Sequence, residues 1–234
     1  MRRLVRSLGV AAAALFVTGV LAAPPAMAQQ SVNFSVGGFV PRGLDGRDST
    51  DVLANNLDFL IFDLDDFKGA TVNAEWLIAL GSHFEGGLGV GWYSKTSPAI
   101  YQDFTHSDGS EIEQDLKLRV VPFSATMRFL PLGRRSFQPY IGFGAGILNY
   151  RYSETGEFID FSDRSIFNDN FVASGTAVGP LILGGVRFGV GSTDVGFEMR
   201  HQSGKGDLPA DLDFSGTTID LGGMNYLFTI NVRF

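Results

Sequence analysis

The segment MNYLFTINVRF, residues 224–234, carries a large apolar side chain at every second position. Successive side chains of a β-strand point to opposite faces, so one face of this segment is apolar and the other is mostly polar. Such a strand fits between hydrocarbon and a polar interior, although the last strand of a soluble sandwich could show the same alternation. The apolar face would consist of Met224, Tyr226, Phe228, Ile230, Val232 and Phe234.

Seven further segments repeat this alternation. No segment after residue 28 has the roughly 18 consecutive apolar residues of a transmembrane helix, so a membrane protein would have to span with strands of about 9–11 residues. The predicted outward sets are Val32, Phe34, Val36 and Val40; Val72, Ala74, Trp76, Ile78 and Leu80; Phe84, Leu88, Val90 and Trp92; Val121, Phe123, Ala125, Met127 and Phe129; Ile141, Phe143, Ala145 and Ile147; Val178, Ile182, Val186 and Phe188; and Val195, Phe197, Met199 and His201.

The connections between these segments alternate in length. Those at 81–83, 131–137 and 191–193 are short, and those at 41–68, 96–113, 153–170 and 204–218 are long. The long connections and their rims hold 21 of the 25 acidic residues. Short turns on one side and long loops on the other are typical of an even-stranded membrane barrel. The sequence therefore predicts an all-β fold: an eight-stranded antiparallel up-and-down transmembrane β-barrel with four long extracellular loops and short periplasmic turns.

The first 28 residues have the layout of a secretory signal peptide. Basic residues at Arg2, Arg3 and Arg6 precede an apolar run that ends at Ala26-Met27-Ala28. We expect cleavage after Ala28, which leaves a single barrel domain at residues 29–234 with 15 basic and 25 acidic residues. This negative balance argues against nucleic acid as a partner. Cysteine is absent, which excludes disulfides, thiolate metal sites and a lipid-anchored cysteine.

Over residues 29–234 the pattern resembles the small bacterial outer-membrane β-barrel family, with its OmpA-like and OmpW-like barrel domains. The resemblance rests on the signal peptide, the eight alternating segments, the run Tyr140-Ile141-Gly142-Phe143-Gly144-Ala145-Gly146 and the terminal Phe234. It implies the outer membrane of a Gram-negative-type bacterium, with outer-membrane lipid as surroundings. It also implies that the barrel-assembly machinery reads Tyr226, Phe228, Ile230, Val232 and Phe234. The pattern departs from that of full-length OmpA, in which a further domain follows the last strand, so we do not expect a peptidoglycan-binding role.

Inward-facing positions of the predicted strands carry both glycines and charges. Glycines at 87, 89, 91, 142, 144 and 146 would permit tight curvature or leave a narrow passage. Because buried charges need partners, we expect the inward charges to plug the interior, with Arg187 opposite Glu198. A gated ion path through the same network is the alternative. The predicted network consists of Glu75, Glu85, Arg128, Arg187, Glu198, Arg200 and Arg233.

Two surface sites are candidates for contact with lipid. Lys117, Arg119 and Arg151 would form an outward basic patch at the height of lipopolysaccharide phosphates, or else be ordinary solvated rim charges. A bulge is expected near Pro122. His201 and Ser203 share a strand face, which is similar to the His-x-Ser pair of lipid A deacylases. That family has asparagine where this chain has Gly204, and an orienting acid could only be guessed at Asp213 or Asp211.

The acidic stretch 58–66 interleaves carboxylates with Leu60, Phe62 and Leu64, which we expect to fold over the barrel mouth. Its carboxylate spacing does not match a calcium-binding hand, so neither a metal nor another cofactor is predicted. The first hypothesis is a non-enzymatic integral barrel with a structural or surface-interaction role. The alternatives are a narrow, OmpW-like channel for small apolar compounds and a lipid A deacylase using His201 and Ser203. The oligomeric state is not decided by the sequence, and a monomer is favoured.

Overall fold

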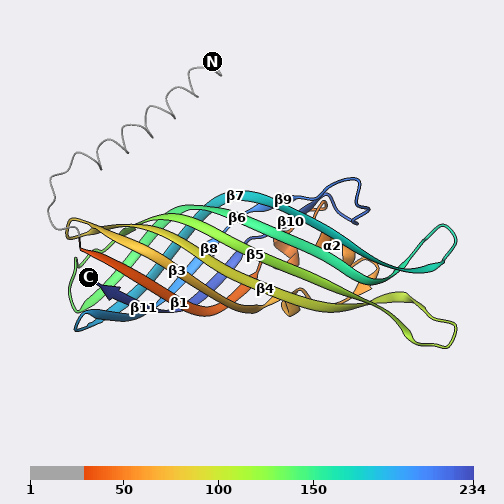
Figure 1. Cartoon of the computed structure of the whole chain (residues 1–234), viewed down its shortest axis with the longest axis horizontal. Coiled ribbons are helices and arrows are strands. Elements are labelled where there is room, and N and C mark those ends of the chain that lie inside the picture. The colour runs from red at the N-terminus through yellow and green to blue at the C-terminus, as the bar shows by residue number, and fades with distance from the viewer. Residues whose placement is uncertain (1–28) are drawn as a thin grey trace, which may run out of the picture.

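A computed structural model describes residues 29–234 (Figure 1). The predicted signal peptide and its cleavage after Ala28 lie outside these described residues. None of the helices in residues 29–234 is long and apolar enough to cross a membrane. Eight strands form the wall: β1 (Gln30–Pro41), β3 (Gly69–Leu80), β4 (Phe84–Thr105), β5 (Glu111–Phe129), β6 (Phe137–Ile159), β7 (Ile166–Val190), β8 (Thr193–Gln202) and β11 (Gly223–Arg233).

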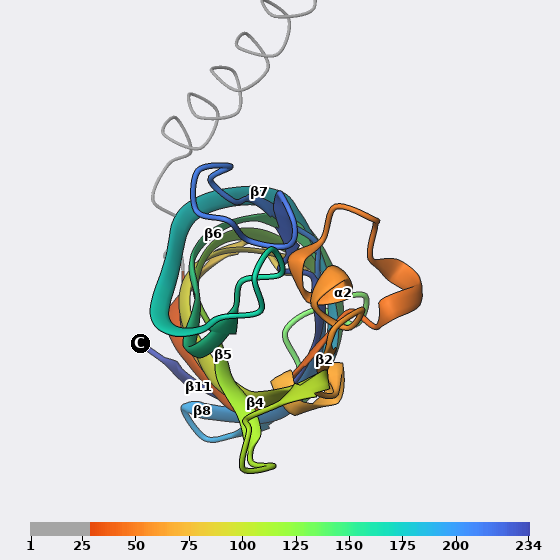
Figure 2. The ribbon, with the colours of Figure 1, turned by 90° about the vertical axis from the view of Figure 1, so that its right-hand side faces the viewer.

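The eight wall strands form a closed antiparallel ring, which Figure 2 shows end-on. Each strand pairs with its neighbour in the chain, and β11 pairs with β1, with Ile230 opposite Phe34 and Phe228 opposite Val36. Closure pairs the backbone groups of every strand, which is required where no water is available. The predicted fold is confirmed.

The outer face of the ring carries an apolar belt. Phe143, Val178 and Phe228 are each about 70% exposed, and many other outward side chains of the predicted sets are also exposed, to a smaller fraction. A soluble protein rarely exposes so much contiguous apolar surface. Along β4 the belt runs from Phe84 to Trp92, which is about 20 Å in height for strands that rise about 3.4 Å per residue and tilt by about 40°. This height is close to that of outer-membrane barrels.

Two of the four long connections are hairpins rather than loops. β4 continues to Thr105 and β5 begins at Glu111, while β6 continues to Ile159 and β7 begins at Ile166. Above the belt the same alternate positions of β5 still face outward, but they carry charged residues, and the inward positions now carry the apolar residues Ile112, Leu116 and Leu118. The sequence search for outward apolar residues therefore ended these strands too early. Figure 1 shows both hairpins extending well past the rest of the molecule.

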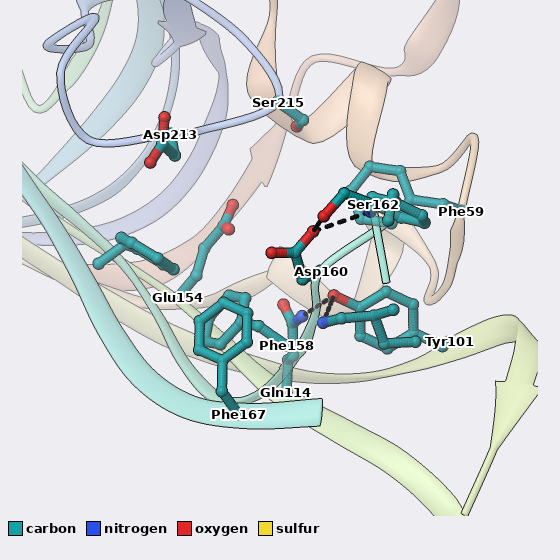
Figure 3. Close-up of a pocket in the computed structure, with 13 residues that line it drawn as sticks. Phe59, Tyr101, Gln114, Glu154, Phe158, Asp160, Ser162, Phe167, Asp213 and Ser215 are labelled. Atoms are coloured by element: carbon teal, nitrogen blue, oxygen red, sulfur yellow. Dashed lines mark hydrogen bonds between the residues drawn. The ribbon is translucent and has the colours of Figure 1, made fainter. Parts of the chain in front are cut away.

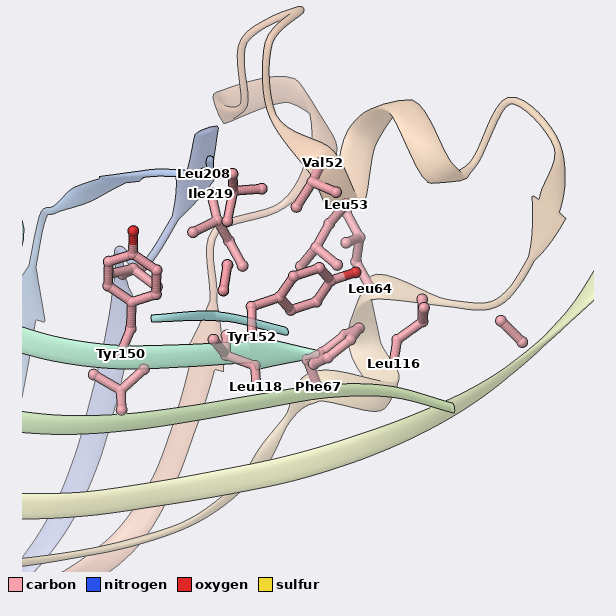
Figure 4. Packing of buried hydrophobic residues seen from close by; sticks show 14 of the residues in the cluster. Val52, Leu53, Leu64, Phe67, Leu116, Leu118, Tyr150, Tyr152, Leu208 and Ile219 are labelled. Carbon is pink, nitrogen blue, oxygen red and sulfur yellow. The ribbon is translucent and has the colours of Figure 1, made fainter. Parts of the chain in front are cut away.

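The other two long connections fill the outer half of the barrel. The first contains η1 (Leu44–Gly46), α2 (Val52–Asn56), β2 (Leu60–Ile61) and η2 (Leu64–Phe67), and the last contains β9 (Lys205–Asp207) and β10 (Thr218–Asp220). The Asp51 side chain caps α2 by accepting from the Leu53 and Ala54 backbone amides. Their buried residues pack against inward side chains of the wall, as Figure 4 shows for Val52, Leu53, Phe67, Leu116, Tyr152, Leu208 and Ile219.

Candidate functional site

Four buried charged side chains lie together inside the membrane-spanning part of the barrel. The Arg128 guanidinium lies 2.5 Å from Glu75 and 2.9 Å from Glu198, and Arg200 lies 2.7 Å from Glu198 and 3.2 Å from Glu75. These residues come from β3, β5 and β8, so the cluster connects different sides of the wall. With two positive and two negative groups it is neutral. Thr126 donates to Glu75 at 2.7 Å and Tyr140 donates to Glu198 at 3.0 Å.

The remaining predicted network residues make different pairs. Arg187 contacts Glu85 at 2.5 Å across the barrel, so the prediction that it pairs with Glu198 was wrong. In the observed register Arg187 faces Gly196 and Glu198 faces Gly185, and the long arginine side chain reaches the far wall instead. Arg134, from a short turn, also approaches Glu85, at 3.4 Å.

Arg233 does not join the central cluster. It lies at the short-turn end, where its guanidinium is 3.5 Å from Asp194, a residue that the predicted network did not include. The same reasoning also missed Thr126, Tyr140 and Arg134. Thr126 and Tyr140 share the inward parity of the charged residues, so an uncharged polar side chain at an inward position was the available signal.

In the part of the chain that the structure describes, buried side chains pack the interior around this cluster. Arg128, Arg187 and Glu198 are at most 2% exposed, and Leu130, Tyr140, Leu181 and Leu183 form an apolar layer beside them. The inward glycines at 89, 91 and 146 line a cavity of only about 10 Å³, which is about the space of one water molecule. Charged and apolar side chains together fill this part of the barrel.

A much larger cavity, of about 480 Å³, lies at the outer mouth between the two hairpins and the first and last long connections (Figure 3). Its wall is largely aromatic, with oxygen-bearing side chains among the rings. The aromatic members are Phe59, Tyr101, Phe158, Phe161, Phe167 and Phe171, and the polar members are Gln114, Glu154, Asp160, Ser162, Asp213 and Ser215. Leu60 and Leu64, which were expected to fold over the barrel mouth, are buried in the core of the mouth and do not line this cavity.

Glu154 is the most buried carboxyl group of this cavity, at 6% exposure. It stands on β6 above the apolar belt, and its Oε1 accepts from Asn56 Nδ2 and from the Tyr152 hydroxyl, both at 2.7 Å. Burial raises the pKa of the Glu154 carboxyl group, and the two hydrogen bonds oppose that shift. Inward parity with Tyr152 would have marked Glu154 as a mouth residue, but the sequence analysis assigned it to a loop.

The predicted basic patch forms a compact group on the outer face. Arg119 lies directly opposite Arg151, and its guanidinium is 5.6 Å from the centre of the Trp92 ring. Lys117 is two residues further up β5, also exposed. The pairing register runs unbroken through Pro122, so the expected bulge is absent from this strand pair. The outward residues one step closer to the short turns are at the upper edge of the apolar belt; they are Trp92, Val121, Asn149 and Thr176.

His201 and Ser203 do not form a catalytic pair in the structure. Among residues 29–234 no hydrogen bond joins their side chains, and the Ser203 hydroxyl instead accepts from the Arg42 guanidinium at 3.2 Å. Arg42 is in turn held by Asp220 at 2.9 Å. Neither Asp211 nor Asp213 makes an ion pair with His201. No group of His, Cys, Asp and Glu in the described part of the chain is arranged to hold a metal ion.

The residues predicted to serve as an assembly signal lie on the outer face of β11. Tyr226, Phe228, Ile230, Val232 and Phe234 are between 40% and 71% exposed, in the belt and at its short-turn edge. Their side chains are available to lipid or to another protein from outside the barrel.

The closed ring, the apolar belt and the filled polar interior define an eight-stranded transmembrane barrel of the outer-membrane type. Among solved structures the outer membrane protein OprG of Pseudomonas aeruginosa is similar, at 12% identity over 88% of this chain and 96% of that one, with a TM-score of 0.51. At this identity the similarity shows the fold alone.

Two further structures match more distantly. Neisserial surface protein A is 13% identical over 88% of this chain and 97% of that one, with a TM-score of 0.44. The attachment invasion locus protein Ail of Yersinia pestis, in complex with a heparin analogue, is 10% identical over 89% and 100%, with a TM-score of 0.41. No family model matches the sequence, and a search of curated proteins finds no match.

Proposed function

We propose that this protein is a non-enzymatic integral barrel of the outer membrane of a Gram-negative-type bacterium, with a structural or surface-interaction role rather than a transport role. The filled interior is the observation that supports this most directly. Arg128, Glu75, Glu198 and Arg200 balance one another's charge in the spanning region. Removing one partner of such a cluster is costly, so the cluster favours a fixed plug. The chemistry available for recognition then lies at the outer mouth and rim.

Planar-bilayer recording tests the closed interior. We expect purified, heat-modifiable protein to give no unitary conductance steps, and a general porin added afterwards to the same bilayer shows that channels would be detected. Stable unitary steps from the protein alone would contradict the proposal and favour the channel alternative.

Lipid A analysis tests the non-enzymatic part. The Ser203 hydroxyl accepts a hydrogen bond from Arg42 and is not hydrogen-bonded to His201. We therefore expect identical lipid A mass spectra from cells that express the protein, cells that express the Ser203→Ala variant and cells that carry an empty vector. Loss of an acyl chain that depends on Ser203 would make the protein a deacylase.

A contact with lipopolysaccharide at Lys117, Arg119 and Arg151 is a second proposal. Like charges directly opposite each other on a sheet are destabilising, yet Arg119 faces Arg151 and, within residues 29–234, none of the three basic side chains has an acidic partner. An anionic group between them would offset that repulsion, and the patch stands just above the belt, where lipid phosphates lie.

Co-purification measures this contact. We expect the triple variant Lys117→Gln, Arg119→Gln, Arg151→Gln to retain several-fold less lipopolysaccharide after detergent extraction. The matched control removes three exposed charges elsewhere, by Lys68→Gln, Arg135→Gln and Arg164→Gln. Equal retention by both triple variants would reject a specific site.

A further inference from the structure

We propose that the cavity at the outer mouth binds an organic ammonium cation, with the apolar body of the ligand against the phenylalanine rings and its N–H groups bonded to Glu154 and Gln114. This inference deepens the proposed surface role by naming a ligand class for it. The argument uses the size of the cavity, the charge of its wall and one buried acceptor that has no partner.

The cavity has the size and the wall of a small-molecule site. Its volume of about 480 Å³ lies within the usual range of about 300–1,000 Å³ for ligand pockets, which are mostly apolar with a few placed polar groups. The rings contact one another around it, with 6.0 Å between the centres of Phe59 and Tyr101 and 4.8 Å between those of Phe158 and Phe171. Aromatic faces attract cations, because the ring quadrupole is negative there.

The charge of the wall selects a cation. Three of its thirteen lining residues are acidic, namely Glu154, Asp160 and Asp213, and none is Lys, Arg or His. Within residues 29–234 Glu154 forms no ion pair, although it is buried. Asp160 Oδ1 is occupied by the Ser162 backbone amide and hydroxyl, at 2.8 and 2.6 Å, which fixes this carboxylate at the cavity edge. A buried carboxylate lacking a cation is costly, and a bound ammonium group would supply one.

Gln114 provides an independent indication of a ligand that donates hydrogen bonds. This side chain is 3% exposed and its Nε2 donates to the Tyr101 hydroxyl at 2.8 Å, but its buried Oε1 has no hydrogen-bond partner. Figure 3 shows that oxygen turned away from Tyr101, on the side of Phe158 and Glu154. An unpartnered buried acceptor beside a carboxylate fits a primary ammonium group, whose three N–H donors could bond both.

A titration with 4-fluorophenethylammonium tests the proposal. The barrel is placed in lipid nanodiscs, binding is followed by the fluorine NMR signal, and empty nanodiscs give the partition background. We expect saturable binding, and we expect the neutral analogue 2-(4-fluorophenyl)ethanol to bind at least ten-fold more weakly. No saturable binding of the amine, or equal binding of the alcohol, would overturn the proposal.

Two variants locate the site. Glu154→Gln keeps an amide oxygen that can accept from Asn56 and Tyr152, so the mouth should fold, and we expect it to weaken amine binding at least ten-fold. Glu113→Gln removes an exposed carboxylate from the opposite face of neighbouring β5 and should leave binding unchanged. Unchanged binding by Glu154→Gln would overturn the site. That result would leave the bilayer recording unaffected, so failure of this inference is distinguishable from failure of the proposed function.

Discussion

Glu154 is a carboxyl group that the fold buries without a basic partner, and its pKa is raised by that burial. A carboxyl group whose folded-state pKa exceeds the unfolded value contributes stability that is fully present below the unfolded pKa and is lost as the pH rises through the folded pKa. The window therefore begins at the ordinary glutamate value of about 4.3 and extends upward. We expect Glu154→Gln to become more stable relative to the native protein as the pH rises through this window.

Urea unfolding in micelles, followed by the fluorescence of Trp76 and Trp92, measures this difference. Pairs of experiments at about pH 4 and about pH 8 compare stability below the ordinary glutamate pKa with stability well above it. The control variant Glu113→Gln removes the same charge from the exposed face. A stability difference for Glu154→Gln that does not change between the two pH values would show that the carboxyl group pays no penalty for its position.

Gly37 and Gly38 are adjacent residues of β1 that differ in the space around them. A Cβ at Gly37 would lie 1.8 Å from the Tyr226 carbonyl oxygen of β11, whereas a Cβ at Gly38 would meet nothing within 4 Å. Backbone cannot move aside without disturbing the pairing that closes the ring. We expect Gly37→Ala to cost about 1–3 kcal/mol in unfolding free energy and Gly38→Ala to change it by less than about 0.5 kcal/mol. Equal midpoints in urea for the two variants would count against this account of closure.

At the scale of elements, α2 has only five residues and depends on Asp51 rather than on its own propensity. Asp51 caps the helix, forms a buried ion pair with Arg47 at 2.9 Å and accepts from the Asp220 amide at 2.6 Å. Asp51→Ala removes all three contacts and should cost the first long connection about 3 kcal/mol or more.

Limited proteolysis measures that loss. We expect segment 42–68 of the Asp51→Ala variant to be cleaved several-fold faster, while the barrel keeps its shifted mobility on unheated gels. Asp45→Ala, in exposed η1, is the matched control. Equal cleavage rates would mean that the wall packing alone holds this connection in the mouth.

At the scale of the whole molecule, the Glu75–Arg128–Glu198–Arg200 cluster ties β3, β5 and β8 together across the interior. Arg128→Met leaves two buried carboxylates short of a partner, so we expect it to cost about 3–5 kcal/mol. Adding Glu75→Gln, Glu198→Gln and Arg200→Met removes the unpaired charges and should recover most of that loss. Urea midpoints measure both. A quadruple variant no more stable than Arg128→Met alone would show that the cluster is not a charge-balanced unit.

The parts of this fold that sequence could predict are those where the membrane imposes a rule. Hydrocarbon requires apolar side chains at every second position of a spanning strand. Alternation therefore identified the strand that contains Tyr226 and Phe228, and the seven other strands of the wall. The rule stops at the belt edge, and beyond it Leu116 and Leu118 point inward, so the hairpin extensions were not recognised.

The candidate sites were less accessible to sequence reasoning. Arg119 and Arg151 lie on neighbouring strands that are joined by a short turn. Their positions opposite each other could therefore be predicted by counting residues from that turn. Arg187 reaches Glu85 across the interior, and this contact depends on the curvature of the barrel and on the length of the two side chains. The register of neighbouring strands does not predict such a contact. The mouth cavity forms where β4, β5, β6, β7 and two long connections meet. The alternation along a single strand contains no information about that meeting.

The two strand hairpins have a consequence for how the molecule is encountered from outside. β4 continues thirteen residues past Trp92 to Thr105, so the tips at 106–110 and 160–165 stand roughly 30 Å above the belt. In the proposed outer-membrane orientation, macromolecules that approach the cell would touch these tips before any other part of residues 29–234. An epitope tag inserted beside Gly109, at an exposed turn far from the wall, should be displayed on intact cells without disturbing membrane insertion.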